Sequence, residues 1–184
     1  MFRDVVLVFH IIGVVLGVGG ASVADYVHLK GLKSMRMERR LQVIYPIVSN
    51  LIIIGVFVLV VTGSILVGLN PGLISSGLFK LKMVLVSVIL INALVLHSYV
   101  RPHMIKNLQE GHPCKSLNKF VFETSLFGSI SIVTWYGVLF LALLKGYGFS
   151  VLTFLGIYFG VLLLAFVISY NVQIRSNLFR HCRV

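Results

Sequence analysis

Three histidines lie in or at the end of long apolar stretches, where a neutral imidazole can bind a metal ion. His10 stands inside the uncharged run 5–24, His28 follows 18 residues later, and His97 closes the uncharged run 83–100. Eighteen residues are five full turns of α-helix, so His10 and His28 would share one helix face. Ionisable groups within a membrane span are costly and usually face the bundle interior or a ligand. These histidines are therefore the first candidates for chemistry.

Small residues follow the same helix face. Gly13, Gly17, Gly20 and Ala24 lie at offsets of 3, 7, 10 and 14 residues from His10. Gly13 and Gly17 form a small-xxx-small pattern, which favours close packing between helices. The same glycines would leave room for a flat macrocycle held by His10, since neutral imidazole is a common axial ligand of haem iron. Haem ligation, an interhelical hydrogen bond and a proton relay all stay open for His10.

A second axial ligand would come from the segment around residues 80–97. Lys80, Lys82 and Met83 lie at the depth of His10, whereas His97 lies at the depth of His28. The alternative for both lysines is that their ammonium groups snorkel to the membrane surface. His10 and His28 differ in depth by about 27 Å, so one macrocycle cannot use both. We expect one noncovalent haem b at His10, and a second at His28 and His97 is left open.

Length and composition define the elements that must position these residues. The chain has 184 residues, of which 58% are hydrophobic and 11% charged, whereas soluble domains average about 25% charged residues. A soluble enzyme is therefore excluded. The charged residues leave five uncharged runs of 18 or more residues, and about 20 helical residues cross a bilayer. The turn sequence Asn70-Pro71-Gly72 ends the second helix. We predict a single all-α domain, residues 1–184, with five transmembrane helices at about 4–29, 42–68, 78–100, 118–144 and 148–172.

The net charge of +11 predicts how the bundle is oriented. With five spans, 12 of the 16 Lys and Arg residues fall on the side that holds the first and third connections and the C-terminus. Basic loops stay in the cytoplasm. We therefore expect an external N-terminus, a cytoplasmic C-terminus and a multi-pass protein of the cell membrane. The basic residues mark topology and bind no nucleic acid. Asp25 and Glu123 could pair with arginines such as Arg101 at the cytoplasmic rim, and this pairing is left open.

Two segments carry a resemblance to a known group of membrane proteins. The sequence FHIIGVV at 9–15, followed by Gly19 and Gly20, resembles the first helix of HemJ-type protoporphyrinogen oxidases and of the copper-resistance CopD superfamily. The sequence FKLKMVLV at 79–86, followed by LHSY at 96–99, resembles the lysine-containing helix of the same group. The resemblance covers roughly residues 5–105. It implies a membrane b-type haem protein in which His10 is an axial ligand and Lys80 or Lys82 is the family lysine.

Two functions remain in competition. The first is a haem protein that carries out redox chemistry or electron transfer in the bilayer, with a quinone, a porphyrin or a redox protein as partner. The second is a transporter of copper or a small solute that uses the same histidines together with Met83 and Met104. Many transporters have discontinuous helices, and the absence of a proline in the middle of a span weighs against this class. A structural protein whose histidines form only hydrogen bonds is a third interpretation.

Two further features remain open. Gly13 and Gly17 could also pack against the same helix of a second copy, which would make a homodimer. Cys114 and Cys182, each close to a histidine, could bind zinc or copper, although reduced thiols are expected in the cytoplasm.

Overall fold

The computed structural model describes residues 1–34, 39–100, 102, 117–144 and 150–175. Within these ranges all regular structure is helical. The long helices are α1 (Phe2–Ser34), α2 (Arg39–Leu69), α3 (Gly77–Val95), α5 (Leu117–Leu143) and α6 (Val151–Ile174). A 3₁₀ turn, η1 (Pro71–Ser75), precedes α3, and a π-helical turn, η2 (Leu96–Val100), extends it.

Five of these helical segments are long and apolar enough to cross a membrane. They are Phe2–Val27, Pro46–Leu69, Gly77–Val100, Val121–Leu143 and Val151–Ile174. The prediction of an all-α protein with five spans is therefore confirmed, and the chain is a multi-pass membrane protein. The expected side of each terminus stays a prediction.

Several helix boundaries differ from the predicted ones. α1 begins at Phe2 and continues to Ser34, beyond the apolar stretch. α6 begins at Val151, because Ser150 caps it by accepting a hydrogen bond from the Thr153 backbone N–H at 3.1 Å. The predicted start of this helix, residue 148, lies outside the described residues.

The predicted turn between the second and third helices is confirmed. Pro71 opens η1, where the missing N–H of proline costs no helical hydrogen bond. Ser76 then adopts an extended conformation, with φ −68° and ψ 128°, and α3 begins at the next residue. This reversal sends α3 back through the bundle beside α5.

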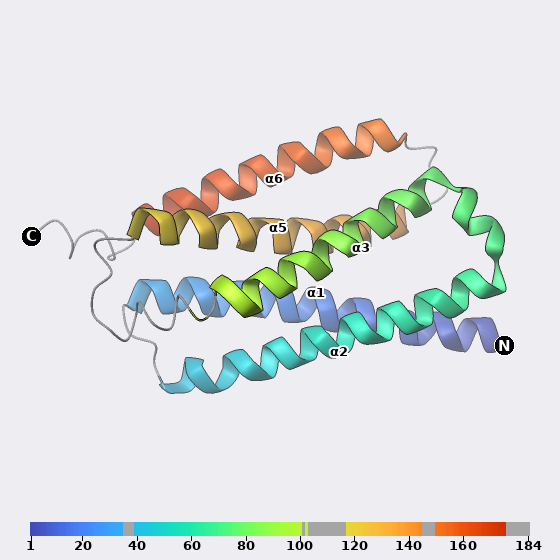
Figure 1. Ribbon diagram of the computed structural model, residues 1–184, viewed down its shortest axis with the longest axis horizontal. Coiled ribbons are helices and arrows are strands. Elements are labelled where there is room, and N and C mark those ends of the chain that lie inside the picture. The colour runs from blue at the N-terminus through green and yellow to red at the C-terminus, as the bar shows by residue number, and fades with distance from the viewer. Residues whose placement is uncertain (35–38, 101, 103–116, 145–149, 176–184) are drawn as a thin grey trace, which may run out of the picture.

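The helices form two groups joined through α5. α1 and α2 pack along most of their length, while α5 packs against α3, α6 and α1 (Figure 1). The N-terminus and η1 lie at one end of the bundle, and the last turn of α6 lies at the other (Figure 1). Large apolar side chains cover the outside, as acyl chains require; Phe57 and Leu152, for example, are 68% and 80% exposed.

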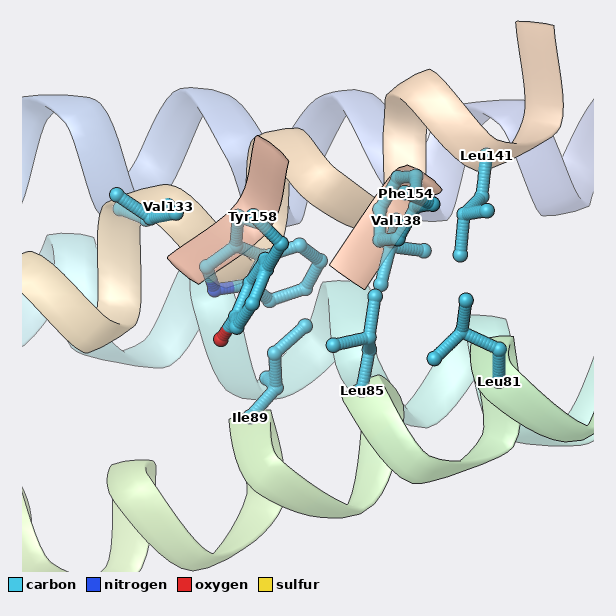
Figure 2. Close-up of a cluster of buried hydrophobic side chains, with 10 residues drawn as sticks. Leu81, Leu85, Ile89, Val133, Val138, Leu141, Phe154 and Tyr158 are labelled. Carbon is cyan, nitrogen blue, oxygen red and sulfur yellow. The ribbon is translucent and has the colours of Figure 1, made fainter. Parts of the chain in front are cut away.

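A buried apolar cluster fills the space between α3, α5 and α6. Leu81, Leu85 and Ile89 of α3 face Tyr158 of α6 and Val138 of α5 (Figure 2). The Tyr158 hydroxyl lies 2.8 Å from the Thr134 hydroxyl oxygen. Thr134 donates its own proton to the Ile130 carbonyl at 2.6 Å, so Tyr158 is the donor to Thr134. Buried polar groups in this protein thus link one helix to the next.

Candidate functional site

His10 is held in place by α2. Its Nδ1 lies 2.9 Å from the Thr62 hydroxyl oxygen, across a sequence separation of 52 residues. His10 is half-buried and Thr62 is buried. Both residues lie within spans, where water cannot replace this hydrogen bond. The bond therefore fixes the imidazole against the second helix.

The hydrogen bonds of Thr62 decide which nitrogen of His10 carries the proton. The Thr62 hydroxyl donates to the Val58 carbonyl oxygen at 2.6 Å, which uses its single proton. Towards His10, Thr62 can then act only as an acceptor. The proton of a neutral His10 imidazole therefore lies on Nδ1, and the Nε2 lone pair is left for another partner. Metal-binding histidines use this arrangement, in which one ring N–H is held by a protein acceptor.

Of the three residues predicted to accompany His10, Lys82 is the one that the fold brings to it. Lys82 lies close enough for its positive charge to act on the His10 imidazole. Lys82 is half-buried, next to the buried Leu81 on the inner face of α3, whereas Lys80 and Met83 are on the exposed face. The two lysines are separated by 200° around the helix axis, since each residue turns the helix by about 100°. The pair His10 and Lys82 is thus the candidate site.

The face of α1 that carries the predicted glycines points into the bundle, where it packs against α2 and α5. Gly13, Gly17 and Gly20 are all buried. A Cβ atom at Gly55 of α2 would lie 2.9 Å from the Gly17 nitrogen and 3.0 Å from the Gly13 carbonyl oxygen. A Cβ atom at Gly17 would overlap the ring of Trp135 on α5. The space beside Gly13 and Gly17 is therefore occupied by α2 and Trp135, and their role beside a macrocycle stays a prediction.

The second predicted pair, His28 and His97, is described only in part. His97 lies in η2 at the end of α3 and lines a cavity between α1, α2, α3 and α5. The side chain of His28 lies outside the described part of the chain, as do Cys114 and Cys182. A haem held between His28 and His97 stays a prediction.

Two residues that matter to these sites were not identified from the sequence. Thr62 orients His10, and Trp135 packs on Gly17. Asp25, which the sequence did indicate, lines the same cavity as His97. The possible pairing of Asp25 and Glu123 with arginines such as Arg101 stays a prediction, because Arg101 lies outside the described residues. Glu123 lies 3.8 Å from the Lys119 ammonium along one helix face. The hydroxyl groups of apolar helices were the signal that could have pointed to Thr62.

The donors near His10 suit haem iron. Haem b needs one or two strong axial donors; His10 Nε2 has its lone pair free, and the charge of Lys82 acts on the same imidazole. Lysine can coordinate iron only as the neutral amine. A Cβ atom at Gly63 of α2 would lie 3.6 Å from His10 Cε1, an ordinary van der Waals contact. The donor set therefore fits haem.

Comparison of the chain with models of protein families, with curated proteins and with solved structures gives no match.

Proposed function

We propose that this protein is a membrane b-type haem protein that carries out redox chemistry or electron transfer within the bilayer. The observation that carries the proposal is the hydrogen bond from His10 Nδ1–H to Thr62, which leaves Nε2 free on a residue held rigidly inside a span. An Nε2 lone pair without a partner in an apolar environment contributes nothing to the fold, so a purely structural role does not explain it. His10 would be one axial ligand of the iron.

The surrounding residues would set the properties of the bound group. Haem supplies a one-electron redox centre, and its potential depends on the axial ligands and on the hydrogen bonds made by them. Thr62 would hold the imidazole ring in its orientation and keep the proton on Nδ1. Lys82 would be either the opposite ligand, as a neutral amine, or a positive charge that favours the reduced state.

The transporter alternative has less support. A pathway for copper or another cation that uses His10 would bring the ion close to the positive charge of Lys82, which disfavours a cation. The haem protein is therefore the function that we favour.

The absorption spectrum of the purified protein tests the proposal. Protein produced with ample haem should show a Soret band that shifts when dithionite reduces the iron. The sequence has no Cys-x-x-Cys-His motif for covalent attachment, so acid acetone should extract the pigment. A colourless preparation would argue for the other functions, and pigment that stays with the polypeptide would contradict haem b.

The orientation of the bundle is a second testable part of the proposal. We expect the chain to lie in the cell membrane with the basic connections in the cytoplasm. A reporter fused after Val184 should then be cytoplasmic, and a reporter inserted at Asn70 should be external, because η1 lies at the end opposite the last turn of α6 (Figure 1). The reverse labelling would overturn the orientation and leave the five-helix fold intact.

A further inference from the structure

A cavity of about 350 Å³ lies between α1, α2, α5 and the end of α3. Its walls are mostly apolar, and small residues on three helices, Ala24, Ala93 and Gly128, give it width. Trp135 and the π-helical turn with His97 complete the lining. Cavities of this size and character bind small organic molecules, with a few polar groups that fix the orientation. Neither His10 nor Lys82 lines this cavity, so it is a site separate from the proposed haem ligands.

Asp25 is the carboxylate in this cavity, and it lacks a protein partner. Its Oδ1 faces α5, where a Cβ atom added at Gly128 would lie 3.7 Å away. In the described part of the chain, the half-buried Asp25 has no hydrogen-bond or ion-pair partner, and His97, which also lines the cavity, is an exposed residue. A polar group in an apolar environment is costly unless it is hydrogen-bonded. The half-buried Asp25 carboxylate in this cavity therefore favours a ligand that donates a hydrogen bond.

The basic composition of the connections at this end of the bundle favours a neutral donor over a cation. The cavity lies at the end of the bundle where α1 and α3 finish and α5 begins. The connections at this end belong to the side that carries 12 of the 16 Lys and Arg residues. A concentration of positive charge repels cationic ligands, which disfavours a lipophilic amine. A phenolic hydroxyl donates a hydrogen bond without a charge.

We propose that this cavity binds a lipid-soluble hydroquinone, with one ring hydroxyl donating to Asp25 and the other directed to His97. The flat ring suits a cavity bounded by small side chains, and its apolar tail would extend among the apolar side chains of the bundle. Binding does not require a bound haem, because His10 lies 15 residues before Asp25 on α1, about four helical turns away, and does not line the cavity.

Trp135 makes the proposal directly measurable. It is the one tryptophan of the chain and lines the cavity, so its fluorescence reports on occupancy. The probe is a 1,4-hydroquinone with a decyl chain, added without oxygen to the full-length protein in lipid nanodiscs. We expect saturable quenching, and calorimetry should give the same Kd. The dimethyl ether of the probe, which has no donor, should bind at least about 10-fold more weakly, since a hydrogen bond to a charged group contributes on that scale.

Two substitutions test the role of the cavity residues. Asp25→Asn should weaken binding about 10-fold or more, and Asp4→Asn is the matched control, because Asp4 is exposed and paired with the N-terminal amine. Gly128→Val should also abolish binding by filling the space beside Asp25. His10→Ala should leave binding unchanged, which separates this proposal from the proposed function. Equal affinity for the probe and its ether, tighter binding of decylamine, or unchanged affinity in Asp25→Asn would each overturn the proposal.

Discussion

Replacing Gly17 by leucine is expected to destabilise the folded bundle by about 3 kcal/mol, the upper part of the range for overpacking a tight interior. The cause is local. A Cβ atom at residue 17 would overlap the Trp135 ring, which is only 3% exposed. The backbone of α2 at Gly55 lies against the same turn of α1, so neither neighbour can move freely. Thermal unfolding in detergent should show Tm lowered by about 10 °C.

Gly19→Leu is the matched control for this prediction. Gly19 is on the same helix, two residues away, and a Cβ atom there would meet nothing within 4 Å. The gain in helix propensity on replacing glycine is the same for both variants. Tm of Gly19→Leu should therefore equal or exceed that of the wild type. Equal Tm values for the two variants would contradict the packing of α1 described above.

The sequence was sufficient to predict the number of spans and the inward face of α1. Span number follows from uncharged length, because a bilayer of fixed thickness requires helices of about 20 residues. The face shared by His10, Gly13 and Gly17 follows from the helical repeat alone, since residues three and four apart lie on one side. Both properties depend on one helix at a time, which is why they could be predicted from a single sequence.

Contacts between helices could not be predicted in the same way. Whether His10 meets Thr62 or another hydroxyl of α2 depends on how far α2 is shifted along α1, and that shift is set by the close approach at Gly55. The position of Trp135 against Gly17 likewise depends on the crossing of α1 and α5. Asp25 was placed at the end of α1 by the sequence, but only the fold shows that it lines a cavity.

Replacing His10 by alanine is expected to remove at least about nine-tenths of the bound haem. Alanine deletes the free Nε2 lone pair that is proposed to coordinate iron, together with the Nδ1–H that bonds Thr62. Thr62 keeps its hydrogen bond to the Val58 carbonyl, so the helix loses no backbone partner. Tm of this variant, measured as for Gly17→Leu, should stay close to the wild-type value, which separates loss of a ligand from loss of the fold.

Two further variants show whether the loss is specific to the proposed site. Thr62→Val preserves the size of the side chain but removes the acceptor that orients His10. Outer partners of this kind change affinity for the metal centre by about 10- to 100-fold, so Thr62→Val should weaken haem binding without abolishing it. His97→Ala should leave the haem content unchanged if His10 holds the single haem. A fall to about half would instead indicate the second haem at His28 and His97.

The haem-to-chain ratio of the wild type and of His10→Ala, measured by pyridine haemochrome, tests the central claim most directly. Both proteins should be produced with the same haem supply and purified in the same detergent. The proposed single haem at His10 predicts a ratio near one for the wild type and near zero for His10→Ala. Full haem retention in His10→Ala would contradict the assignment of this residue as the axial ligand.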